Sequence, residues 1–323
     1  MKPSALRVLV CPACKGGLEL RERTQRGGEV LEGDLKCRLC HAGYPVRRGV
    51  PRFVTSGDYA GSFAYQWSHF RSVQLDSQNG RDESSRSFRE TTGWTAESLS
   101  GSRVLDAGVG AGRYAEIVAG AGGEVFGVDL TEAVDAAYEN IGERAGVHLA
   151  QADIFAMPFP AGTFDRAYSI GVLHHTPDPR AAFARVAATV KPGGSLAVYL
   201  YPNPGPSRFG PDLIRRITTR LPLRLMRALS SVAVLLYYPY RLPLIGRALQ
   251  FVCPISLHPD WRGRWLDTFD WYTPRYQWKF LYPEVGQWFQ RAGFAIASMS
   301  GGPIRMCGRR ESVSSPTRLA LRA

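Results

Sequence analysis

Four of the six cysteines form two Cys-x-x-Cys pairs near the N-terminus, a spacing typical of metal binding. The pairs are Cys11 with Cys14 and Cys37 with Cys40. Two tight turns of this kind can direct four thiolates at one ion, and four sulfurs in a tetrahedron suit structural zinc. A redox-active dithiol and two disulfides are the alternatives, and a reducing compartment disfavours the disulfides. We therefore predict one structural zinc site with these four ligands.

A second set of residues could hold a nucleoside. Gly108, Gly110 and Gly112 follow a short apolar segment, and glycine lets the chain turn sharply and a ligand approach the backbone. Asp129 ends the next apolar segment, where a carboxylate can accept both ribose hydroxyls. Asp153 follows the third, where it can accept a hydrogen bond from an adenine amino group. Because a glycine turn also precedes nicotinamide cofactors, the prediction depends on the order of the acids behind it.

These residues need a scaffold that gathers strand ends at one edge. Short apolar segments predict strands at residues 103–107, 124–128, 163–170, 195–201, 294–299 and 304–307, with one more before position 151. Helices are expected over residues 113–119 and 283–292. The alternation of strands and helices along the chain predicts an α/β fold with a Rossmann-like sheet of seven strands. Such a sheet holds ligands at the carboxyl ends of its strands.

Residues 95–201 resemble the class I S-adenosylmethionine-dependent methyltransferases. The matching motifs occupy residues 104–112, 127–129, 152–153, 164–165, 173–176 and 190–194. The resemblance implies S-adenosylmethionine as cofactor and a set of residues that bind it, namely Asp106, Gly108, Gly110, Gly112, Asp129, Leu130, Asp153, Ile154 and Ile170. In this set the glycines shape the methionine pocket, Asp129 holds the ribose, and Asp153 with Ile154 holds the adenine. A domain that kept the fold but lost the cofactor is the alternative.

The cysteine-rich segment resembles the small zinc-binding activator proteins of methyltransferases. Besides the cysteines, the matching residues are 17–18, 33–37, 44–46 and 49–51. In that family the small protein acts in trans, so the resemblance implies a zinc ribbon fused in cis. We expect the ribbon at residues 1–57, a helical linker or lid at 58–94, and the methyltransferase domain at 95–323.

His174 and His175 follow the fourth strand of that domain, where the family resemblance places active-site side chains. Methyl transfer from a sulfonium mainly needs alignment of the nucleophile and exclusion of water. A base is needed only if the acceptor must lose a proton, and histidine titrates near neutral pH. We predict His174 and His175 as catalytic residues, the alternative being that they wall the pocket or cap the next helix.

Residues 202–282 form a predicted helical insertion after the fifth strand, since one helix usually connects these strands. The apolar segment 221–238 contains Arg224 and Arg227, and such a helix can lie on a membrane surface or pack as a lid. Five of the seven tryptophans follow residue 260 and could line an acceptor pocket or form a second small core. We predict that Asp270 and Tyr272 contact the acceptor.

The net charge of +12 is uneven, because residues 202–280 contain 12 basic and four acidic side chains. This surface could meet nucleic acid, an anionic membrane or an acidic substrate, or remain solvated.

We find no signal peptide and no apolar segment long enough to span a membrane, and so expect a cytoplasmic protein. The preferred function is methylation of oxygen or nitrogen on a small-molecule or lipid-linked acceptor. The alternatives are an RNA methyltransferase, which zinc and basic flanks favour, and a non-catalytic binding module; the oligomeric state is left open.

Overall fold

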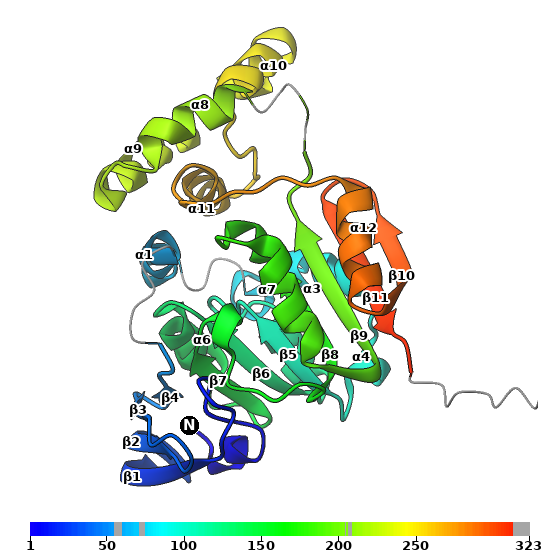
Figure 1. Cartoon of the computed structure of the whole chain (residues 1–323). Helices are drawn as coiled ribbons and strands as arrows, with labels where there is room; N and C mark the ends of the chain where they lie inside the picture. Colours follow the sequence, from blue (N-terminus) through cyan, green and yellow to red (C-terminus); the bar gives the residue numbers. More distant parts are fainter. Residues whose placement is uncertain (55–59, 71–74, 204, 206–208, 313–323) are drawn as a thin grey trace, which may run out of the picture.

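Seven strands form one twisted sheet at the centre of the molecule (Figure 1). The structure, a computed structural model, describes residues 1–54, 60–70, 75–203, 205 and 209–312. The strand order is β10-β11-β9-β8-β5-β6-β7. Their bounds are β5 Arg103–Ala107, β6 Glu124–Asp129, β7 Val147–Gln151, β8 Phe164–Ile170, β9 Val190–Leu200, β10 Phe294–Ser300 and β11 Ile304–Arg310. β5 to β9 run parallel, whereas β11 pairs antiparallel with both β9 and β10.

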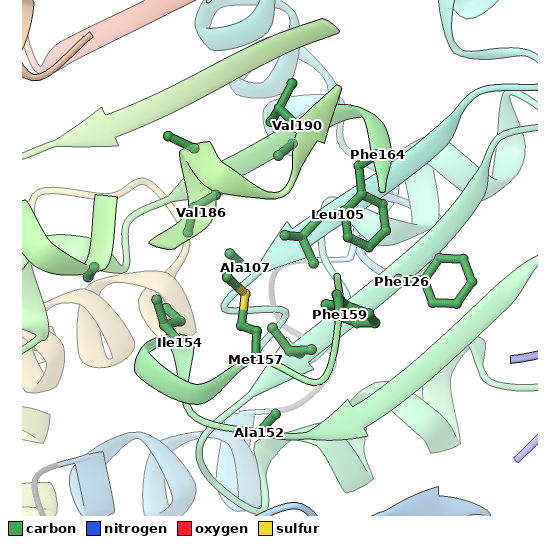
Figure 2. Close-up of a cluster of buried hydrophobic side chains, with 14 of the residues drawn as sticks. Leu105, Ala107, Phe126, Ala152, Ile154, Met157, Phe159, Phe164, Val186 and Val190 are labelled. Carbon is green, nitrogen blue, oxygen red and sulfur yellow. The ribbon is translucent and has the colours of Figure 1, made fainter. Parts of the chain in front are cut away.

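Helices cover both faces of the sheet because its central strands are apolar on both sides. On one face, α7 (Pro179–Ala188) and α12 (Tyr282–Arg291) pack on a cluster that includes Leu105, Phe126 and Phe164 (Figure 2). On the other face, α3 (Glu83–Thr92), α5 (Ala115–Gly120) and α6 (Ala133–Ile141) pack on a cluster that includes Val104 and Val125. Neighbouring residues of one strand thus enter opposite cores, as the two-residue repeat of a strand requires.

The N-terminal segment forms a separate four-stranded antiparallel sheet that lies against the edge strand β7. Its elements are η1 (Pro3–Arg7), β1 (Leu18–Arg26), β2 (Glu29–Cys37), β3 (Gly43–Arg47) and β4 (Val50–Pro51). The Phe53 amide donates to the Gln151 carbonyl at 2.8 Å, and Arg52 forms a parallel bridge with Gln151. Arg52 also pairs with Asp135 of α6 at 2.5 Å, and Lys2 Nζ donates to the Gly142 carbonyl at 2.6 Å.

Four helices follow β9 before the chain returns to the sheet at α12. They are α8 (Phe209–Thr218), α9 (Leu223–Leu235), α10 (Pro243–Val252) and α11 (Trp261–Tyr272), with the short η6 (Pro239–Arg241) between α9 and α10. In Figure 1 α11 lies nearest the sheet, and α8, α9 and α10 form a layer beyond it. The helix α1 (Gly61–Phe70) packs against α11.

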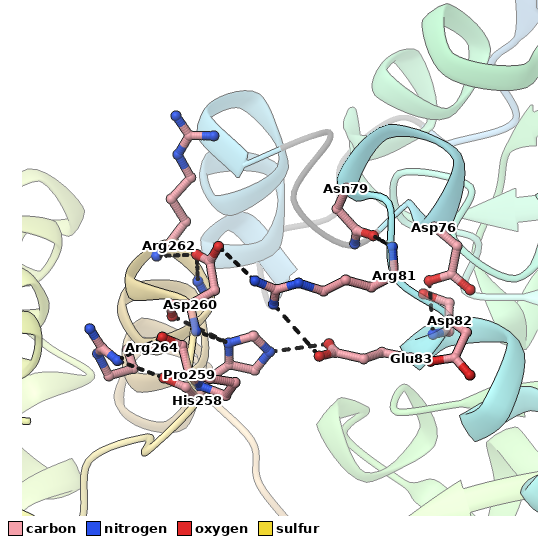
Figure 3. A network of polar contacts seen from close by, with 12 residues as sticks. Asp76, Asn79, Arg81, Asp82, Glu83, His258, Pro259, Asp260, Arg262 and Arg264 are labelled. Atoms are coloured by element: carbon pink, nitrogen blue, oxygen red, sulfur yellow. Dashed lines mark hydrogen bonds and ion pairs between the residues drawn. The ribbon is translucent and has the colours of Figure 1, made fainter.

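A polar network connects this insertion to the segment before α3 (Figure 3). Arg81 pairs with Asp260 at 3.0 Å, and His258 Nε2 lies 3.1 Å from Glu83. Asp260 also caps α11, because its carboxylate accepts from the amides of Arg262 and Gly263. The same residues therefore begin α11 and hold it against the sheet domain.

The predicted fold class is confirmed: an α/β sheet of seven strands, an N-terminal four-cysteine ribbon and a helical insertion after strand five. β9 begins at Val190, five residues before the predicted start, because Val190 already pairs with Phe164 of β8; residues 191–194 then form an irregularity before the pairing resumes at Ser195. The predicted boundary at residue 57 lies outside the described residues. Within those residues, no helix is both long and apolar enough to cross a membrane.

Candidate functional site

A cavity of about 780 Å³ opens at the carboxyl ends of the central strands, between the sheet and α11. The turns after β5, β6 and β8 line one end of it, and side chains of α11 line the other. Nine of the predicted site residues line this cavity: Gly108, Gly110, Asp129, Leu130, Ile154, Ile170, His175, Asp270 and Tyr272. Predicted cofactor and acceptor residues, up to 164 positions apart in sequence, thus line the same cavity.

The glycine turn and Asp129 are joined by direct hydrogen bonds. Gly110 N donates to Asp129 Oδ2 at 3.0 Å, and the Thr131 amide and hydroxyl donate to Oδ1 at 2.9 and 2.8 Å. Burial raises the pKa of Asp129, and the donors oppose that shift. Gly108 has a φ of +105°, and a Cβ there would lie 2.3 Å from the Val172 side chain. The turn therefore needs glycine and holds the carboxylate at the cavity wall.

Arg113 adds a cation at the same end of the cavity. Its Nε donates to the Ser84 hydroxyl of α3 at 2.8 Å, and its guanidinium lies 4.9 Å from the ring centre of Tyr114. These contacts orient the guanidinium beside the glycine turn, where it can bind a ligand carboxylate. The sequence analysis missed Arg113, although its position directly after the third glycine could have indicated it.

Four of the predicted cofactor and catalytic residues do not line the cavity: Asp106, Gly112, Asp153 and His174. Asp106 is buried in β5, where burial raises its pKa to about 7 and it accepts a hydrogen bond from Tyr168 at 2.8 Å. Gly112 lies against Ile141, which a Cβ would approach to 2.8 Å. Asp153 accepts from the Phe155 amide at 2.9 Å, so its carboxylate caps the turn that carries Ile154.

The two predicted catalytic histidines differ in their surroundings. His174 is fully buried and stacks on Tyr201 with ring centres 3.9 Å apart, and neither of its ring nitrogens has a hydrogen-bond partner among the described residues. His175 lines the cavity, and its Nδ1 lies 2.8 Å from the Tyr276 carbonyl, which requires a proton on Nδ1. Burial lowers the pKa of His175 to about 4, so at neutral pH this imidazole is uncharged and a weak base.

Asp270 has the better electrostatic environment for accepting a proton. It lines the cavity from α11, and Tyr201 donates its hydroxyl to Asp270 Oδ2 at 3.2 Å. Burial, together with the charge of Asp267 one helical turn earlier, raises the pKa of Asp270 to about 7. A carboxylate with a pKa near the working pH is suited to general base catalysis. Tyr201, which the sequence analysis also missed, is the first residue after β9.

The aromatic segment serves both as a small core and as the cavity wall. Met226, Phe269 and Tyr272 form a buried cluster to which Tyr65 and Trp271 add. The Tyr272 hydroxyl donates to the Pro254 carbonyl at 2.8 Å, which fixes its ring at the edge of the cavity. Part of the tryptophan-rich segment therefore forms a second small core, and part of it lines the cavity.

The four N-terminal cysteines converge on one point. All of their sulfurs lie within 4.8 Å of one another. Cys11 and Cys40 Sγ are 3.6 Å apart, and Cys14 and Cys37 Sγ are 3.4 Å apart. Four sulfurs at zinc-ligand distance from a shared ion would lie about 3.8 Å from each other, so the cluster fits tetrahedral zinc. Amides of Leu39 and Cys40 point at Cys37 Sγ and lower its pKa to about 6, which favours a thiolate ligand.

Two segments of the chain match known protein families. Residues 105–198 match the family model described as a methyltransferase domain, and residues 2–49 match that of Trm112p-like proteins. The chain joins a Trm112p-like domain to a methyltransferase domain. The matched methyltransferase segment contains the glycine turn, Asp129 and both histidines.

The curated relatives align only with the methyltransferase domain. A ubiquinone biosynthesis O-methyltransferase of Aromatoleum aromaticum is 40% identical over 102 residues, which is 30% of this chain and 43% of the relative. A sterol 24-C-methyltransferase of Gibberella zeae is 33% identical over 106 residues, which is 31% of this chain and 27% of the relative. The chain thus matches less than half of the length of either relative.

Among solved structures, similarity extends over more of the chain at low identity. One comes from a complex between the Trm112 methyltransferase activator of Haloferax volcanii and a candidate methyltransferase. It is 12% identical, covers 78% of this chain and 99% of that chain, and has a TM-score of 0.48.

The Trm112p-like domain is expected to bind about one zinc ion per chain. Replacing Cys37, which is fully buried at the cluster, by serine removes one ligand and should release the metal and unfold the domain. Elemental analysis of the purified protein and the Cys37→Ser variant measures this. A serine at Cys253, outside the cluster, is the matched control and should keep its zinc. Metal-free wild-type protein would refute the zinc site.

Proposed function

We propose that the protein transfers a methyl group from S-adenosylmethionine to an oxygen or nitrogen of a small-molecule or lipid-linked acceptor. The observation that carries this proposal is the shared cavity, in which the glycine turn and Asp129 face Asp270 and Tyr201. A cavity of about 780 Å³ has room for a nucleoside cofactor and part of a second molecule.

The cofactor end of the cavity has groups for each part of S-adenosylmethionine. Asp129 would accept the ribose hydroxyls, Leu130 and Ile154 would enclose the adenine, and Arg113 would pair with the methionine carboxylate. When bound, the cofactor supplies an electrophilic methyl group on a sulfonium. The carboxylate of Asp153 points into its own turn, so we assign it to positioning Ile154 and not to adenine contact.

The acceptor end of the cavity can take up a proton. Asp270, with a pKa of about 7, would accept the proton of an acceptor hydroxyl or amine as the methyl group arrives. Tyr201 donates to the same carboxylate and holds it in place. His175, uncharged at neutral pH, would bound the reaction space, and Trp271 and Tyr272 would contact an apolar or aromatic acceptor.

Two observations support the proposed chemical class of the acceptor: the residues that line the cavity and the names of the relatives. Phe63, Tyr199 and the aromatic residues of α11 line the acceptor end, which favours a ring or an apolar chain. The relatives are named for ubiquinone biosynthesis and for sterol methylation, and ubiquinone and sterols are both lipid-soluble molecules. Of the two acceptor atoms, oxygen has the added support of the O-methyltransferase relatives.

Methyl transfer from labelled S-adenosylmethionine into a fractionated cell extract tests the proposed function. The label is expected in the lipid or small-molecule fraction, and none is expected with the Asp129→Ala variant. Label in RNA would instead support an RNA methyltransferase, with the zinc domain and the basic insertion as its binding surface. Binding of S-adenosylmethionine without transfer to any fraction would contradict catalysis and favour a binding module.

A further inference from the structure

Three helices of the insertion expose apolar side chains to solvent. On α9 and its C-cap the exposed leucines and valine recur at helical spacing, at Leu225, Leu229, Val232 and the capping Leu236, while Met226 and Ala233 are buried. The most exposed apolar residues of this layer include Leu235 at 77% and Leu244 at 82%. Such a layer is unusual on a monomeric soluble protein, where large exposed apolar patches mark interaction sites.

The other two helices repeat the pattern. Leu213 and Ile217 are exposed on α8, and Leu244, Ile245, Phe251 and Val252 are exposed on α10. We call the outward side of α8, α9 and α10 the apolar layer. In Figure 1 these helices lie beyond α11, on the side away from the sheet. The exposed fractions show that the other described residues leave these side chains open to solvent.

Arginines accompany these apolar side chains without any acidic residues. Residues 213–259 contain seven Arg and neither Asp nor Glu. Five of the arginines are exposed: Arg216, Arg220, Arg224, Arg241 and Arg247. Among the described residues, none of these five forms an ion pair with a carboxylate. Leucines flanked by exposed arginines match the acyl chains and anionic headgroups of a lipid bilayer.

We propose that the apolar layer binds the surface of a bilayer that contains anionic lipids. The helices would lie in the interface with their leucines among the acyl chains and their arginines at the phosphates. A second copy of the chain is the less favourable occupant, because a twofold interface through this layer would bring the same arginines face to face. A bilayer supplies both the apolar interior and the negative charge.

The position of the cavity gives this contact a role in acceptor entry. Pro211 of α8, Gln250 of α10 and the adjacent Pro254 line the same cavity as Asp129 and Asp270. The apolar layer and the acceptor end of the cavity are therefore built from the same helices. A lipid-linked acceptor could pass from the bilayer between these helices without crossing water. This route for the acceptor rests on the proposed function, whereas bilayer binding does not.

Vesicle co-sedimentation of the full chain without S-adenosylmethionine tests the binding. Vesicles of phosphatidylcholine alone are compared with vesicles of equal parts phosphatidylcholine and phosphatidylglycerol. We expect binding to the anionic vesicles that weakens with added salt. The Leu235→Glu/Leu244→Glu double variant should bind at least about tenfold more weakly, because two exposed apolar anchors are lost and two negative charges are added.

The Leu281→Glu variant is the matched control, since Leu281 is 58% exposed and lies outside the apolar layer. It should bind as the wild type does. Failure of the wild type to bind anionic vesicles, or equal loss in both variants, would overturn the proposal. Light scattering that shows a stable dimer, dispersed by the double variant, would assign the layer to a second copy and also overturn it. Because no methyl transfer is measured, failure here leaves the proposed function intact.

Discussion

The Asp129→Ala variant should bind S-adenosylmethionine about 10²- to 10⁴-fold more weakly than the wild type. The carboxylate would lose hydrogen bonds to two ribose hydroxyls, and each such bond to a charged group is worth about 1.5–3 kcal/mol. It would also release Gly110 N and Thr131, which donate to it in the structure. Isothermal titration calorimetry measures the affinity directly.

Glu132→Ala is the control for the Asp129 variant. Glu132 is exposed, lies three residues further along the chain and caps α6 without a side-chain hydrogen bond. Its removal should leave the affinity unchanged, and circular dichroism should show that both variants are folded. A folded Asp129→Ala protein with wild-type affinity would refute the assignment of the ribose site.

The Asp270→Asn variant should lower kcat by about 10²- to 10⁴-fold while the affinity for S-adenosylmethionine stays the same. Asparagine keeps an oxygen that can accept from Tyr201 but cannot take the proton of the acceptor. In the wild type, kcat/KM should fall with decreasing pH below about 7, because Asp270 of the free enzyme is then protonated and no longer a base. That limb of the pH profile should be absent in the variant.

Asp267→Asn distinguishes a titrating base from a merely structural residue. Asp267 contributes to the raised pKa of Asp270, so its neutralisation should move the acidic limb of the pH profile to lower pH and preserve kcat at high pH.

The His175→Asn variant tests whether the histidine, and not Asp270, accepts the proton. If that variant abolishes the pH dependence and Asp270→Asn does not, the proton passes to His175 and the assignment of Asp270 is wrong.

Six of the nine residues predicted to bind the cofactor line the cavity, and they could be found in the sequence because this end of the cavity is made of local motifs. Gly108 is required by a positive φ and a close approach to Val172, and Asp129 by its position at the end of β6. Such backbone requirements involve residues only a few positions apart, so they can be recognised in the sequence as motifs with a fixed spacing. The cysteine pairs belong to the same class, since metal geometry fixes their separation within each turn.

The acceptor end could be predicted only in part, because its chemistry depends on distant neighbours. Asp270 was named from its aromatic surroundings, but its raised pKa comes from burial and from Asp267, and its orientation from Tyr201, which follows β9. The histidines were predicted as bases from their place after β8. The sequence gives no sign that packing would bury His174 and lower the pKa of His175 to about 4.

The docking of the Trm112p-like domain on β7 has a consequence for how the two domains stay together. Two separate chains would part on dilution and would need matched rates of synthesis. Here one backbone connects Arg52, which follows β4, and the strand that ends at Gln151, so the association of the two domains does not depend on protein concentration. Every methyltransferase domain that is made carries its own zinc domain, and the ratio of the two is fixed by translation.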